Sequence, residues 1–163
     1  MATECSIHVA PTPTGCVVRV TGRGTMRESR AARDVAMRTI KSGAAVVVDL
    51  SGCTYLDSTF LGGLLDLFRA AAASAGKFSV AAPPDRRVKL LGSLRLDKVF
   101  PSADVPPDTV GDWIALSPEG YDKQDIAQHV MLCHRKLAEL DTPMRTVFAH
   151  IAQEMEKELA PPH

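Results

Sequence analysis

An unbroken apolar run, Ala44 to Val48, which ends in Asp49 and Leu50, limits the folds open to this chain more than any other segment. A strand with one face in water alternates apolar and polar residues, whereas a strand covered on both faces is apolar throughout. The run therefore predicts a central strand in a sheet that is at least partly parallel. Since 45% of the 163 residues are apolar, the chain is long enough to bury such a core.

Strand-like and helix-like segments alternate over the first 100 residues. Predicted strands show short apolar runs, and predicted helices show apolar residues three to four apart. The predicted strands are 7–10, 15–21, 44–50 and 77–82, the predicted helices are 26–41, 60–75 and 84–91, and a last short apolar segment covers 96–100. This order predicts an α/β fold, a mixed sheet layered by helices.

The rest of the chain has a different pattern, which predicts three parts: a body over 1–100, a Pro-rich linker over 101–117 and an amphipathic helical extension over 118–163. The apolar stripe of the first predicted extension helix is Ile126, Val130, Cys133, Leu137 and Leu140. Thr142 as N-cap, with Pro143 at the first helical position, is expected to open the second helix.

Two such helices are not stable alone in water and must bury their apolar stripes. The candidate surfaces are the body, a second copy of the chain in a homodimer, and an outside partner. Residues 117–163 hold 5 Lys and Arg against 8 Asp and Glu, which leaves 14 against 11 in residues 1–116. Docking on the body is favoured because these net charges are opposite and the linker is short.

Composition and charge exclude several classes of function. Lys and Arg number 19, as do Asp and Glu, so no overall field attracts nucleic acid or an anionic membrane. The start "MATECSIHV" has no signal-peptide pattern, the longest apolar runs fall far short of the ~20 residues that cross a bilayer, and the cysteines lack CxxC spacing. We expect a reduced, cytoplasmic chain. The four cysteines are Cys5, Cys16, Cys53 and Cys133.

Three small polar residues, Asp57, Ser58 and Thr59, lie where a helix is predicted to begin. The first turn of a helix leaves backbone N–H groups without partners, and each of these side chains can accept from them. Helix capping explains one of these three side chains, but it does not explain the remaining hydroxyl groups.

Two segments, "VVVDLSGCTYLDSTFLGGLLDLFRAA" and "GKFSVAAPPDRRVKLLGSLRLDKVF", together resemble the STAS domain of bacterial anti-sigma factor antagonists. The resemblance covers about the first 100 residues and leaves the extension unmatched. It implies a STAS-type fold and a regulator of transcription that is not an enzyme. In that family a partner that is both anti-sigma factor and serine kinase phosphorylates the Ser after the Asp, and a PP2C-type phosphatase reverses this partner switching.

By position, the resemblance makes Ser58 the phosphoacceptor, expected at an exposed helix start. The expected partner interface is Asp57, Thr59, Phe60, Leu61 and Gly62. Phe60 stands where the sporulation and stress-response antagonists usually have Gly, so it either packs inward or changes the surface shown to the kinase. The alternative is a constitutive STAS module, as a scaffold, a signalling-complex subunit or a lipid-transport subunit, in which Ser58 only caps a helix.

Other clusters predict no chemistry. His129, Cys133 and His134 lack a second pair of ligands for a metal ion, so we expect a core cysteine, surface histidines, no metal and no cofactor. Ser58 and Asp57 with a distant His could form a hydrolase triad, but the G-x-S-x-G pattern is absent. A basic group is expected to be a solvated face, or else to engage an acidic partner or the acidic extension. Its members are Arg86, Arg87, Lys89, Arg95 and Lys98.

Overall fold

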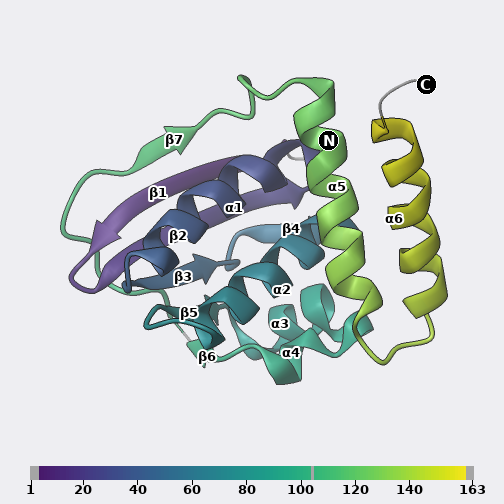
Figure 1. Cartoon of the computed structure of the whole chain (residues 1–163). Coiled ribbons are helices and arrows are strands. Elements are labelled where there is room, and N and C mark those ends of the chain that lie inside the picture. The colour runs from purple at the N-terminus through teal and green to yellow at the C-terminus, as the bar shows by residue number, and fades with distance from the viewer. Residues whose placement is uncertain (1–3, 104, 161–163) are drawn as a thin grey trace.

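The apolar run forms the middle of a seven-stranded sheet in the computed structural model, which describes residues 4–103 and 105–160 (Figure 1). Strand β3 (Ala45–Asp49) lies between β2 (Gly15–Gly24) and β5 (Lys77–Ala81) and is parallel to both. Val46 and Val48 are almost completely buried. The predictions of a central, parallel strand and of a mixed α/β fold are confirmed.

The remaining strands complete the order β6-β5-β3-β2-β1-β7, with β4 paired to β2. Strand β1 (Ser6–Thr12) is antiparallel to β2 and to β7 (Ile114–Leu116). Strands β4 (Cys53–Leu56) and β6 (Ser102–Ala103) are parallel to their partners. The sequence did not predict β4, β6 or β7, because strands of two to four residues are too short to show a period.

The segment predicted as a linker joins the two edges of the sheet, since it contains β6 at one edge and β7 at the other. It is held along its course by contacts with the hairpin of β1 and β2. The Val110 amide donates to the Pro11 carbonyl oxygen at 2.8 Å, and the Arg19 guanidinium lies 3.8 Å from the centre of the Trp113 ring. The division of the chain into body, linker and extension stays a prediction.

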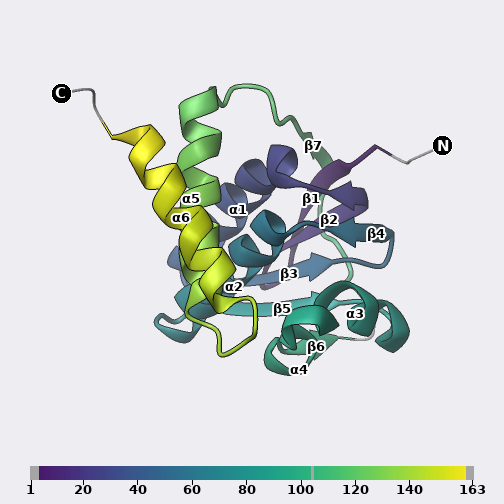
Figure 2. The ribbon, with the colours of Figure 1, turned by 90° about the vertical axis from the view of Figure 1, so that its right-hand side faces the viewer.

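Helices α1 (Met26–Lys41) and α2 (Ser58–Ala72) cover one face of the sheet (Figure 1). Helix α1 begins with a capping box, in which Thr25 and Glu28 satisfy each other's backbone amides. Helix α3 (Pro84–Leu91), the short 3₁₀ helix η1 (Gly92–Leu94) and α4 (Leu96–Val99) lie together near β6 (Figure 2). None of the helices in the described residues is long and apolar enough to span a bilayer.

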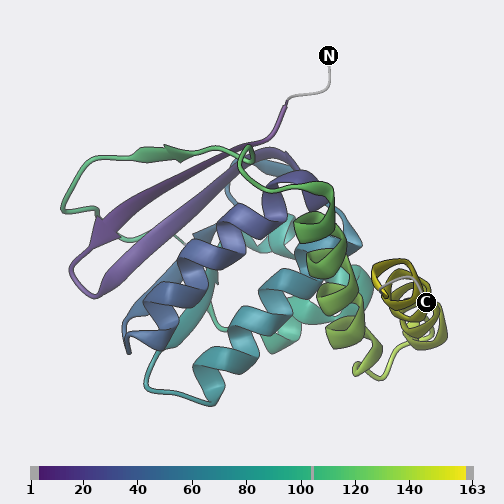
Figure 3. The same ribbon diagram turned by 45° about the horizontal axis from the view of Figure 1, so that its top comes forward.

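Helix α5 (Lys123–Ala138) packs on α1 and α2, and α6 (Arg145–Leu159) packs on the outer side of α5 (Figure 3). Leu137 is fully buried and joins the core of the body. Docking of the extension on the body is therefore confirmed. Thr142 is not the N-cap of α6: it lies in the turn before the helix, because its carbonyl accepts from the Arg145 amide and Met144 takes the N-cap position.

Candidate functional site at the start of helix α2

Asp57 joins the starts of two helices. Its Oδ1 accepts from the Phe60 amide at 2.8 Å, which caps α2, and its Oδ2 accepts from the Met26 amide at 2.7 Å, at the first residue of α1. Burial raises the pKa of Asp57, although the two amides oppose that shift. Asp57 is therefore the N-cap of α2, and the reading in which Ser58 is the cap is wrong.

Ser58 is half-buried under helix α5 and is not exposed as the sequence led us to expect. Its Oγ lies 3.0 Å from Nε2 of His134, and Nδ1 of His134 lies 2.7 Å from the Val130 carbonyl oxygen. A carbonyl oxygen only accepts, so in the neutral ring Nδ1 carries the hydrogen and Nε2 accepts from the Ser58 hydroxyl. The ring of His134 is buried and lies 5.8 Å from that of Phe148 in α6, so His134 is not a surface residue.

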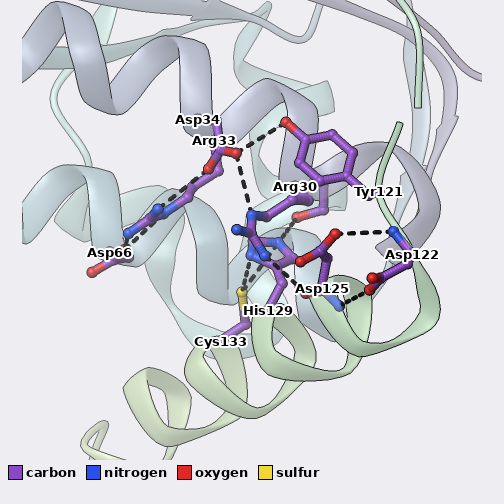
Figure 4. Close-up of polar contacts among 10 residues, drawn as sticks. Arg30, Arg33, Asp34, Asp66, Tyr121, Asp122, Asp125, His129 and Cys133 are labelled. Carbon is purple, nitrogen blue, oxygen red and sulfur yellow. Dashed lines mark hydrogen bonds and ion pairs between the residues drawn. The ribbon is translucent and has the colours of Figure 1, made fainter. Parts of the chain in front are cut away.

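A second buried histidine of α5 contacts α1. Nε2 of His129 lies 2.8 Å from Oγ of Ser29 and 3.5 Å from Sγ of Cys133 (Figure 4). Burial, with Arg30 and Arg33 nearby, lowers the pKa of His129 to about 4, and burial raises the pKa of Cys133 to about 12. Both groups are therefore uncharged at neutral pH. The core position predicted for Cys133 is confirmed, whereas the surface position predicted for His129 is wrong.

The predicted histidine and cysteine cluster has no metal-binding geometry in the structure. Over residues 4–103 and 105–160, no group of three or more His, Cys, Asp or Glu side chains is placed to hold a metal ion.

Gly62 lets α5 approach α2 closely. A Cβ atom at Gly62 would lie 2.4 Å from the carbonyl oxygen of Cys133, closer than real Cβ contacts. Thr59 and Leu61 are buried as well, and Phe60, which is 2% exposed, packs inward under the helix start. The predicted partner interface thus lies inside the protein or beneath α5, and its use by a partner stays a prediction.

Charged and polar groups connect α5 and the segment before it to the body (Figure 4). Arg30 donates to the Asp125 carbonyl oxygen at 2.8 Å, and the Tyr121 hydroxyl donates to Asp34 at 2.9 Å. Asp66 forms an ion pair with Arg33 at 2.9 Å. Further ion pairs join Lys136 to Asp66 at 3.7 Å and Arg69 to Glu139.

The sequence patterns do not indicate this network. The one available signal was the spacing of Arg30 and Asp34, which are four residues apart and form an ion pair within α1 at 3.2 Å. The contacts between different helices cannot be predicted from sequence spacing, because they depend on how the helices pack in the folded protein.

The Ser58 and His134 pair does not complete a hydrolase triad. Their separation of 3.0 Å suits a nucleophile and a base. However, a triad needs an acid on the other ring nitrogen, and in His134 that nitrogen faces a backbone carbonyl. Asp57 is bound to two backbone amides instead.

The basic group divides into structural and solvated members. Arg87 donates to the carbonyl oxygens of Ala82 and Ala103, both at 3.1 Å, and Arg86 donates to that of Cys53. A solvated face is therefore wrong for these two arginines, which bind carbonyl oxygens of the body. The members exposed to solvent are Lys89, Arg95 and Lys98.

Comparisons with known proteins agree with the fold and with the resemblance seen in the sequence. A family model described as "Mlab, STAS domain" matches residues 7–102, which is more than half of the chain. The chain is also similar to the crystal structure of an anti-sigma factor antagonist from Mycobacterium paratuberculosis. The two are 27% identical with a TM-score of 0.50, over 63% of this chain and 87% of the other. A search of curated proteins finds no match. The chain belongs to the STAS domain family.

Proposed function

We propose that this chain is an anti-sigma factor antagonist, which binds an anti-sigma factor kinase through the start of α2 and loses that affinity when Ser58 is phosphorylated. The observation that carries the proposal is the position of Ser58. It is the first residue of α2 in a STAS fold, and Asp57 takes the capping role, so the Ser58 hydroxyl is not needed by the backbone. Similarity to an anti-sigma factor antagonist supports the partner class. The protein acts by binding and not as an enzyme, and a PP2C-type phosphatase restores it.

The charge of a phosphate explains how such a switch would act. Phosphorylation adds about −1.5 to −2 charge at pH 7. The start of a helix favours an anion, so the modified Ser58 leaves α2 folded. The cost falls on the complex, because a phosphate that faces a partner carboxylate in a desolvated interface weakens binding by several kcal/mol, on the order of a thousandfold.

We expect Ser58→Ala to bind the kinase constitutively and Ser58→Asp to bind it poorly. The Ser58→Ala chain is used as bait in a lysate of the source cells, the captured protein is identified by mass spectrometry, and its affinity for both variants is measured. Labelled ATP followed by peptide mapping locates the phosphate, with the exposed Ser93→Ala as the matched control. Equal affinity of the two Ser58 variants, or a phosphate that maps elsewhere, would refute the switch.

The second candidate is a constitutive STAS module without a switch. The hydrogen bond between Ser58 and His134 favours it, because this bond gives Ser58 a structural role that needs no phosphorylation. In that case Ser58→Ala lowers the melting temperature, the peptide map shows no phosphate at Ser58, and partner binding does not depend on residue 58.

A further inference from the structure

We infer that the α1–α2 face around Ser58 is a helix-binding surface that α5 occupies from within the same chain, so a partner helix binds there only when α5 is displaced. Three residues of α5 fix this position: His134 on Ser58, His129 on Ser29, and Cys133 on Gly62. The covering helix comes from outside the residues matched by the family model, which end at 102. The identity of the displacing partner rests on the proposed function, whereas the cover itself does not.

The STAS body is complete without the cover. The family model ends 21 residues before the start of α5, and the similar antagonist is covered over 87% of its length by only 63% of this chain. All strands that the structure describes lie before α5. Removal of α5 from its seat therefore uncovers one face of α1 and α2 but leaves every strand pairing in place.

The α1–α2 face on which α5 lies, called the seat below, fits only a helix with a particular surface. The missing side chain at Gly62 admits a helix backbone at close range, which requires a small residue such as Cys133 on the occupant. Arg30 and Arg69 flank the seat and bind the Asp125 carbonyl oxygen and the Glu139 carboxylate of α5. A competing partner helix thus carries a small residue opposite Gly62 and an acidic group opposite Arg69, whereas Arg30 needs only a backbone carbonyl oxygen.

Polar contacts make this cover easier to exchange than an apolar one. Both histidines of α5 bond to serine hydroxyls, and water can satisfy these groups once the helix leaves. When α5 leaves, a few of its apolar side chains lose their burial, above all Leu137. A partner helix that binds in the same place buries apolar side chains of its own instead.

The first experiment tests the cover without any partner. The Ser58→Cys variant of the full chain is alkylated with iodoacetamide, and peptide mapping gives the rate at that site. We expect at least about a tenfold higher rate when Cys133→Phe is added, because Phe cannot fit against Gly62. The control Gln128→Phe places the same residue on an exposed position of α5 and leaves the rate unchanged.

A second pair of measurements guards against a variant that fails to fold. A thermal melt must show a cooperative transition for the Cys133→Phe chain. His134→Ala, which removes the contacts of the imidazole ring with residue 58 and Phe148 but places no larger side chain against Gly62, must also raise the alkylation rate. An equal rate in all of these chains would overturn the cover.

The second experiment tests whether the uncovered face binds a helix. The probe is a fluorescent synthetic peptide of residues 121–141, which contains α5. We expect it to bind the Cys133→Phe chain and not a chain in which α5 is locked in place. The lock is Gly63→Cys, because a Cβ atom at Gly63 lies 3.8 Å from Sγ of Cys133, close enough for a disulfide after oxidation with diamide.

The lock also separates this inference from the proposed function. The captured kinase is tested on the Gly63→Cys chain oxidised and reduced, with Gly63→Cys, Cys133→Ser as the control that cannot form the disulfide. Binding to the reduced chain alone supports displacement of α5. Equal binding to both forms overturns the inference and leaves the proposed function intact. Capture of no kinase by any chain, with the peptide bound as expected, refutes the proposed function and supports the helix-binding surface.

Discussion

Asp57 and Ser58 are neighbours in the chain but act on different elements. Both carboxylate oxygens of Asp57 face backbone amides at the starts of α1 and α2, whereas the hydroxyl of Ser58 faces α5. A substitution at Asp57 therefore removes the hydrogen bonds at the starts of α1 and α2, whereas a substitution at Ser58 changes the contact with α5. Phe60, two residues after Ser58, points into the core.

Phe60→Ala should lower the free energy of unfolding by about 3–5 kcal/mol, the usual cost of emptying a buried aromatic site. The side chain is 2% exposed, and its ring packs close to Gly24 in β2. A Cβ atom added at Gly24 would lie 3.0 Å from the Phe60 ring. Urea unfolding measures the change, and Val88→Ala, at a side chain 58% exposed, is the control. A loss for Phe60→Ala no larger than for the control would place Phe60 outside the core.

His129 should make the protein less stable in acid. Its pKa is about 4 in the folded chain and 6.5 as the ordinary value, so between these pH values the unfolded chain binds a proton that the folded chain does not. The free energy of unfolding therefore falls as pH drops from 6.5 toward 4, by up to roughly 3 kcal/mol. His129→Gln should flatten this dependence in urea titrations at several pH values.

The control for this prediction is His150→Gln, at an exposed position of α6. Asp57 acts in the opposite direction, because its raised pKa makes the folded chain take up a proton more readily than the unfolded chain. The comparison of parent and variant removes that contribution. An unchanged pH dependence in His129→Gln would mean that His129 titrates normally.

At the scale of elements, the contact between α2 and α5 depends on two adjacent glycines that differ in their surroundings. A Cβ atom at Gly62 would meet backbone of α5 at 2.4 Å, whereas one at Gly63 would meet the Ser29 hydroxyl at 3.3 Å, which can give way. Both positions are within α2, where Ala is favoured over Gly by about 1 kcal/mol. The two sites therefore form a matched pair.

We expect Gly63→Ala to be neutral or slightly stabilising and Gly62→Ala to unseat α5. Amide hydrogen exchange measures the result directly: the amides of α5 should exchange faster in Gly62→Ala, while those of β3 keep their protection. Equal protection of α5 in both variants would show that the backbone of α5 can shift without leaving its seat.

The elements with a clear apolar pattern, either a period or an unbroken run, were predictable, and those without one were not. The apolar run at Ala44 to Val48 predicted β3 because burial on both faces leaves no polar residue. Strand β7 could not be predicted, since its three residues are defined by pairing with β1. The buried histidines of α5 were missed because their partners Ser29 and Ser58 are 100 and 76 residues away.

At the scale of the whole molecule, α5 packs on α1 and α2, which lie within the residues matched by the STAS family model, and α6 packs on α5. Helix α5 contributes Leu137 to the core, and α6 contributes Phe148. The exposed side chains of Val147 in α6 and of Met144, its N-cap residue, show that the outer helix is only partly packed. Helix α6 therefore leaves part of its apolar surface in contact with solvent.

Deletion of residues 117–163 should leave a folded chain with a lower melting temperature and a newly exposed apolar face. The deletion keeps β7, which ends at Leu116, so the sheet retains all its described strands. A thermal melt and binding of a hydrophobic dye measure the two effects, and light scattering should show the same oligomeric state as the parent. Loss of a dimer on deletion, with the melting temperature unchanged, would instead make the extension a dimerisation element.

The short connection between β7 and α5 determines how the fraction of chains with a displaced α5 depends on the expression level. Only residues 117–122 separate Leu116 from Lys123, so the first residue of a released α5 stays within about 25 Å of the end of β7. A short tether of this kind gives a local concentration in the millimolar range. The balance between covered and uncovered chains is then an intramolecular property, equal at every expression level. At a higher expression level the number of uncovered molecules rises in proportion to the total. The fraction that is uncovered stays the same, and so does the intrinsic affinity that a partner needs to displace α5.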